Sequence, residues 1–131
     1  MRKTITFFAL LAAMTCAPAV ASQAQEVGGA ACATPGTVML SGIPTKRSEL
    51  VPSVGREISG YGRQAQVSNC LIELVCVATD SSDAARDIAS KQCVVVRDQL
   101  VRSDFKKDNI DTSRKNPGNG RVAGMVYFTV K

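Results

Sequence analysis

The stretch that decides the fold is Cys70-Leu71-Ile72-Glu73-Leu74-Val75-Cys76-Val77-Ala78-Thr79, followed by Asp80-Ser81-Ser82-Asp83 and then by residues 84–100. Only Glu73 interrupts the apolar run, which predicts a central strand covered on both faces. The polar run offers helix caps, and its carboxylates favour the positive end of a helix dipole. An apolar stripe at helical spacing follows: Ala85, Ala89, Cys93, Val96 and Leu100. The pattern therefore predicts a strand, a turn and a long amphipathic helix.

Weaker signals flank this unit. We expect a strand over residues 37–43 and, from the apolar face formed by Leu50, Val54, Ile58 and Tyr61, a helix over residues 50–61. Residues 108–120 are polar and contain a strong turn signal, so we expect a loop there. Alternating residues over 122–130 predict a final strand. The fold class expected is α+β, with the order βαβαβ and helices packed on one sheet in two layers.

The N-terminal residues have the features of an export signal. Arg2 and Lys3 precede a short apolar run, and Ala19-Val20-Ala21 is a typical cleavage site, so we interpret residues 1–21 as a signal peptide. No later stretch reaches the roughly 20 apolar residues that span a bilayer, so no transmembrane segment is expected after processing. We then expect a flexible lead over residues 22–36 and a single domain over residues 37–131. Processing lowers the formal net charge from +5 to +3, too small a basic bias for nucleic-acid binding.

Four cysteines remain after processing: Cys32, Cys70, Cys76 and Cys93. An even number in an exported chain indicates two disulfides, for which three pairings are possible. The predicted packing favours a bond between Cys76 on the strand and Cys93 on the helix, which leaves Cys32 with Cys70. Spacing alone does not choose among the three pairings.

The chain lacks the residues that most enzymes need. It has no histidine, and no nucleophile elbow, phosphate loop or dinucleotide motif, so we expect neither an enzyme nor a cofactor or metal. The acidic residues around Asp80 are interpreted as a solvated helix start. Five basic residues surround the last loop: Lys106, Lys107, Arg114, Lys115 and Arg121. They could meet an anionic partner such as a cell-wall peptide, a lipid head group or an acidic protein face, or form an ordinary solvated loop.

From about residue 49 onward, the chain resembles the OmpA-like peptidoglycan-binding domain of bacterial envelope proteins. Ala78-Thr79-Asp80 stands where that family has His-Thr-Asp at the end of a strand. Residues 94–100 are similar to the end of the family helix, and Asn119-Gly120-Arg121-Val122 resembles the closing Asn-Arg-Arg-Val motif. The resemblance covers most of the chain after processing and lies in pattern and order more than in identical residues.

The resemblance implies a ligand site. In the family, an aspartate after the strand and an arginine on the helix hold the amine and carboxylate of a peptidoglycan stem residue. Asp80 matches the first position, Gln92 stands at the second with Lys91 beside it, and Arg121 lies in the closing motif. Glutamine cannot form the two parallel charged hydrogen bonds of an arginine.

These residues support a hypothesis of function with one alternative. We expect a small non-enzymatic protein of the periplasm or outer envelope that binds peptidoglycan weakly or an envelope protein. The alternative is a secreted, disulfide-stabilised interaction factor or effector that does not bind the cell wall.

Overall fold

The computed structural model describes residues 32–131, which belong to one compact unit. The expected signal peptide and most of the expected lead lie outside the described residues. In chain order, the elements are β1 (Gly36–Leu40), the short 3-10 helix η2 (Arg47–Glu49), α1 (Pro52–Val67), β2 (Ile72–Val77), α2 (Asp83–Arg102), the 3-10 helix η3 (Lys107–Asn109), β3 (Ile110–Lys115) and β4 (Val126–Val130). Within this part of the chain, no helix has the length and apolar character needed to cross a membrane.

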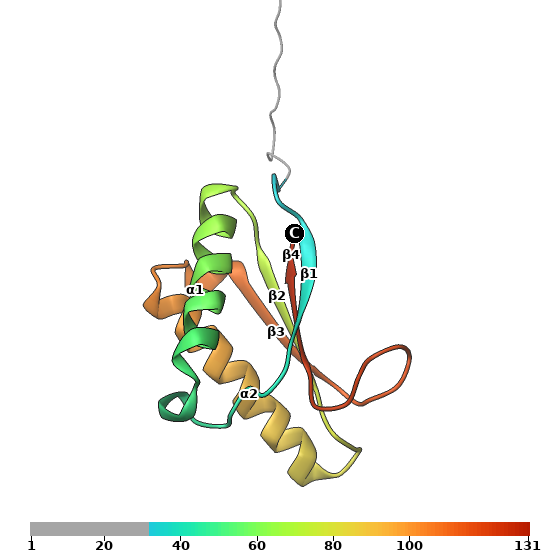
Figure 1. Ribbon diagram of the computed structural model, residues 1–131. Helices are drawn as coiled ribbons and strands as arrows, with labels where there is room; N and C mark the ends of the chain where they lie inside the picture. Colours follow the sequence, from blue (N-terminus) through green and yellow to red (C-terminus); the bar gives the residue numbers. More distant parts are fainter. Residues whose placement is uncertain (1–31) are drawn as a thin grey trace, which may run out of the picture. The chain divides into compact units, whose positions relative to one another are not determined.

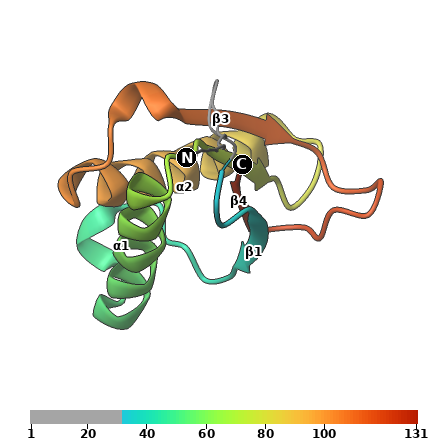
Figure 2. The same ribbon diagram turned by 90° about the horizontal axis from the view of Figure 1, so that it is seen from above.

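The four strands form one mixed sheet in the order β1-β4-β2-β3. β4 pairs antiparallel with both of its neighbours, opposing Val38 of β1 and Leu74 of β2 with Phe128. β3 pairs parallel with β2, in a register that sets Ile110 beside Ile72. Figure 2 shows β1 and β3 at opposite edges of the sheet with β4 between them. Because a parallel pair needs a crossover, α2 serves as the connection between β2 and β3.

Both helices pack on the same face of the sheet (Figure 1). The core between the layers contains Ile58 of α1, Leu100 of α2, Leu74 of β2 and Phe128 of β4, all fully buried. The rings of Tyr61 and Phe128 lie 5.6 Å apart between their centroids. The expected two-layer α+β architecture is therefore confirmed.

The expectation that β2 is central and covered on both faces is wrong in part. β2 is central, and its residues Ile72, Leu74 and Cys76 are buried against the helices. On the opposite face Val77 is also buried, whereas Glu73 and Val75 are half-buried. On that face, Lys131 Nζ lies 3.4 Å from Glu73 Oε1. The sequence misled because Val75 raises the apolar content of a part of this face that water still reaches.

The expected loop over residues 108–120 is also wrong in part, because it contains β3. This strand is at the sheet edge and is mostly polar, with only Ile110 and Ser113 half-buried. An edge strand with little buried surface has no apolar alternation to reveal it. The expected strand over 122–130 is shorter and begins at Val126, and the expected strand over 37–43 ends at Leu40.

The helix expected over residues 50–61 extends from Pro52 to Val67. Its glycines permit close packing, since a Cβ on Gly62 would lie 2.7 Å from Leu100 Cδ2 of α2.

Both helices end in the same way. Cys70 N–H donates to Ala65 O beyond α1, and Phe105 N–H donates to Leu100 O beyond α2. Asn69 and Asp104, which precede these donors, have positive φ, as a Schellman ending requires.

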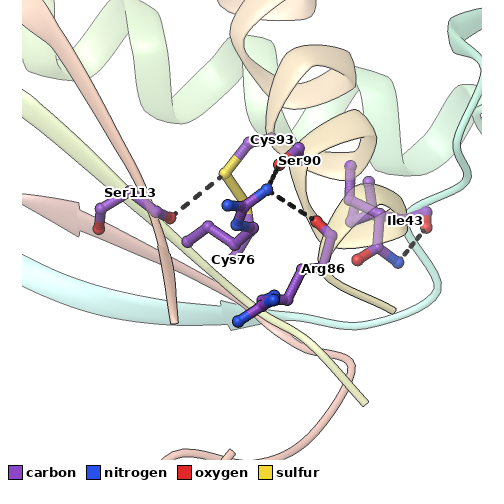
Figure 3. The surroundings of a disulfide bond; sticks show 8 residues. Ile43, Cys76, Arg86, Ser90, Cys93 and Ser113 are labelled. Carbon is purple, nitrogen blue, oxygen red and sulfur yellow. Dashed lines mark hydrogen bonds between the residues drawn. A yellow bond between two sulfur atoms is a disulfide. The ribbon is translucent and has the colours of Figure 1, made fainter. Parts of the chain in front are cut away.

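The structure contains the two expected disulfides. One joins Cys76 of β2 to Cys93 of α2, and the other joins Cys32 to Cys70 just before β2. They are the two pairs that the expected packing favoured. Figure 3 shows the first bond between the helix and the sheet, with Cys93 Sγ 3.8 Å from Ser113 O of β3. Within the crossover unit β2–α2–β3, the disulfide thus ties α2 covalently to β2.

Candidate functional site

Asp80 lies in the turn between β2 and α2. Its Oδ1 accepts a hydrogen bond of 2.7 Å from Ser82 N–H, and the Ser82 hydroxyl in turn caps α2 by accepting from Ala85 N–H at 3.2 Å. Hydrogen bonds from the Ser82 hydroxyl and the Ser82 N–H lower the pKa of Asp80. The carboxylate is therefore ionised at neutral pH. It is also exposed to solvent, so it can meet a cationic group of a ligand.

Two other segments flank the end of β2 next to Asp80. On one side, Ala78 N–H donates to Lys115 O at the end of β3. On the other side, Gly124 N–H donates to Val77 O and Val77 N–H donates to Met125 O. The connection between β3 and β4, which carries Arg121, therefore returns to this strand end (Figure 1). The structure therefore places Asp80 at the same end of the sheet as the backbone of Lys115 and the segment that follows Arg121.

Lys91 and Gln92 lie farther along α2. Gln92 is nine positions after Asp83 at the start of the helix, which corresponds to about 13.5 Å along its axis. Gln92 Nε2 donates to Ile43 O at 2.9 Å and so ties the segment after β1 to the helix. Lys91 Nζ forms an exposed ion pair with Asp87 Oδ2 at 3.0 Å. The amide nitrogen of Gln92 and the amine of Lys91 thus have partners within the protein.

The structure places the backbone of Lys115 beside Ala78, two positions before Asp80. The basic cluster that contains Lys115 is visible in the sequence. The position of Lys115 was not predictable, because β3 was expected to be a loop. Arg114, its neighbour, has a different role. Arg114 Nη1 donates to Ser90 Oγ at 2.9 Å and lies 3.5 Å from Arg86 O, two acceptors that Figure 3 shows beside the Cys76–Cys93 bond. Arg114 therefore links β3 to α2 across the crossover.

The end of the sheet near which the segments with Asp80, Lys115 and Arg121 meet, which we call the junction edge, carries charges of both signs. The carboxylate can accept hydrogen bonds from an amine, and the two basic side chains can pair with a carboxylate. The start of α2 contributes the positive end of a helix dipole at the same place. Within residues 32–131, no three potential metal ligands of the His, Cys, Asp or Glu type come together. The junction edge thus offers charged groups of both signs.

Comparison with known proteins shows the fold. No family model and no curated protein matches the sequence. Among solved structures, the chain is similar to the OmpA-like domain of FopA1 from Francisella tularensis subsp. tularensis SCHU S4, with a TM-score of 0.56 and 12% identity over 72% of this chain and 73% of that one. It is also similar to the periplasmic domain of Helicobacter pylori MotB, with a TM-score of 0.55 and 12% identity over 72% and 78% of the two chains. The protein therefore has the OmpA-like fold.

Proposed function

We propose that this OmpA-like chain is an exported, non-enzymatic protein of the cell envelope that binds peptidoglycan weakly at the junction edge. In this model, the carboxylate of Asp80 binds an amine of a stem peptide. Arg121 and Lys115 attract the carboxylate of the same peptide. The observation that carries the proposal is the position of Asp80, at the carboxyl end of β2 and the start of α2 in an OmpA-like fold.

The disulfides support an extracytoplasmic location. Disulfides persist mainly in oxidising compartments such as the bacterial periplasm, and two of them join parts of this small domain. The solved structures that share the fold include a periplasmic domain. Export also agrees with the expected signal peptide over residues 1–21.

Gln92 explains why we propose weak binding. The helix position expected to bind a carboxylate is glutamine, and its Nε2 already donates to Ile43 O. A ligand would have to compete with this bond, and a neutral amide cannot replace the charge of a guanidinium. Arg121 in the loop and Lys115 at the end of β3 are therefore left as the carboxylate partners.

A pull-down with purified peptidoglycan tests the proposal. We expect the processed protein to sediment with the polymer and Asp80→Asn to reduce the bound fraction, because asparagine can keep the hydrogen bond to Ser82 N–H but loses the charge. Asp104→Asn is the matched control. It removes the same charge from an exposed residue just beyond the other end of α2, and asparagine accepts the positive φ found there.

Two results would contradict cell-wall binding through Asp80. The first is a wild-type protein that stays in the supernatant. The second is an equal loss of binding in Asp80→Asn and Asp104→Asn, which would indicate attraction by general charge. A protein that does not bind the polymer would favour the alternative, a secreted interaction factor stabilised by its two disulfides.

A further inference from the structure

A second place in the molecule has the features of a ligand site and is separate from the junction edge. A surface cavity of about 390 Å³ lies where η2, α1 and the last half of α2 meet. Three arginines line it, Arg47 from η2 and Arg56 and Arg63 from α1. None of the residues that line it is acidic. The volume is within the range of small-molecule sites in proteins.

The three arginines have no anionic partner in the part of the chain that the structure describes. The ion pairs among residues 32–131 involve Arg86, Lys91 and Lys131, all of them elsewhere. Arg56 and Arg63 are seven residues apart, two turns of α1, so both lie on the face that carries Ser59 and lines the cavity. Like charges gathered in this way repel one another, and an anion placed among them would be attracted by all three.

The start of α1 adds to the positive potential. Its N-cap residue Val51 forms no side-chain cap, and its first turn contains no acidic residue. Val51 and Pro52 both line the cavity, so the positive end of the α1 dipole borders it. Unpaired backbone N–H groups at such an end bind phosphate and similar anions. This feature is independent of the arginines and points to the same ligand charge.

The floor of the cavity is preorganised. Gln99 Nε2 of α2 donates to Ser59 Oγ at 2.8 Å and to Gly55 O at 3.3 Å, and Ser59 is buried. Leu50 adds an apolar wall, and a Cβ on Gly55 would lie 3.5 Å from Leu50 Cδ2. The cavity therefore combines a fixed polar floor, an apolar side and a basic rim.

The geometry points to a phosphate-bearing anion as the ligand of this cavity. Three guanidinium groups from two elements, together with a helix start, can engage the several oxygens of a tetrahedral phosphate from different sides. A planar carboxylate offers only two oxygens. The apolar wall provides room for an organic group attached to the phosphate. Such a phosphate could belong to a small soluble molecule or to the head group of a phospholipid.

Isothermal titration calorimetry of the processed chain with pyrophosphate at low salt tests this inference. We expect saturable binding that Arg56→Gln combined with Arg63→Gln weakens by about tenfold or more, since each removes a charged hydrogen-bond donor. The matched control is Lys106→Gln combined with Lys107→Gln, which removes the same charge from exposed residues outside the cavity. We expect the control to retain most of the affinity. Circular dichroism would establish that both double variants are folded.

A second arm identifies the source of the phosphate. Vesicles with and without an anionic phospholipid are sedimented with the wild type and with both double variants. Binding to the anionic vesicles that is lost with Arg56 and Arg63, without pyrophosphate binding, supports a lipid head group. Binding of pyrophosphate alone supports a soluble ligand.

Three results would overturn the inference. They are no binding in either arm, an equal loss in the control variant, and tighter binding of citrate than of pyrophosphate, which would show a preference for carboxylates. None of these results depends on whether the protein binds peptidoglycan, because the cavity and the junction edge use different residues.

Discussion

The two helices of this domain end alike but begin differently. α2 starts with the Ser82 cap and Asp83 in its first turn, and the bond from Cys93 to Cys76 ties it to the sheet. α1 starts with an uncapped valine, has no acidic residue in its first turn and relies on glycine packing against α2. The difference indicates that stability is concentrated in α2 and the strands beside it. At the start of α1, no acidic side chain offsets the positive end of the helix dipole, and this end borders the arginine-lined cavity.

The largest effect should come from removing the covalent tie of α2. Cys76→Ala combined with Cys93→Ala should lower the free energy of unfolding by about 3 kcal/mol, because the bond closes a loop of 17 residues. Urea denaturation under oxidising conditions measures the change. The reduced wild type, which has lost both bridges, should be less stable than this variant. A loss below about 1 kcal/mol would show that packing alone holds α2, and the contrast with α1 would fail.

The next effect concerns the contact between the helices. Gly62→Ala should lower the free energy of unfolding by about 1–3 kcal/mol, because its Cβ would approach Leu100 Cδ2 to 2.7 Å. Gly60→Ala is the control in the same helix, where a Cβ meets nothing within 4 Å. It should raise stability by about 0.4–1 kcal/mol. Thermal or urea unfolding of both variants tests this, and equal effects would mean that α1 does not depend on close approach to α2.

A third pair of variants removes the N-cap of α2 and adds one to α1. Ser82→Ala should cost about 1 kcal/mol, because Ala85 N–H loses its acceptor. Val51→Ser should instead stabilise the protein by up to about 1 kcal/mol, since Val51 already has the extended backbone of an N-cap. Urea unfolding at constant pH measures both changes. If Val51→Ser destabilised the domain, the start of α1 would not be a simple missing cap.

The smallest effect should be the pH dependence at Asp80. The lowered pKa means that its ionised form stabilises the folded state above the ordinary value of 3.8. This contribution is lost as the pH falls through the lowered pKa. The stability difference between wild type and Asp80→Asn should therefore be constant from neutral pH to about pH 4 and shrink at lower pH. NMR titration of the Asp80 carboxyl carbon checks the direction, and a pKa above 3.8 would contradict it.

The strength of each sequence signal follows the amount of apolar surface that an element buries. β2 and α2 were predictable because their buried residues repeat at the spacing of a strand and of a helix. β3 was missed because it is a polar edge strand whose backbone pairing with β2 leaves no mark on its side chains. The two disulfides could be expected because the strand and helix that carry Cys76 and Cys93 were both predicted.

The candidate site residues were harder to predict than the fold. Asp80 could be placed because its turn has a clear signature before α2. The contact of Gln92 with Ile43 O joins residues 49 positions apart, and no local pattern reveals it. The cavity with Arg47, Arg56 and Arg63 could not be predicted from the sequence for a similar reason. Arg56 and Arg63 share a helix face, but Arg47 joins them only through the path of η2.

The strand order also has a consequence for how the domain is made. β4 is the last element in sequence, yet it lies between β1 and β2, so that Val130 pairs with both Gly36 and Ile72. β1 therefore cannot join β2 in one sheet until Val126–Val130 has been synthesised. Such distant pairing also slows folding, because a long loop must close before its contacts form. A chain truncated before Val126 would lose the strand that joins β1 to the rest of the sheet.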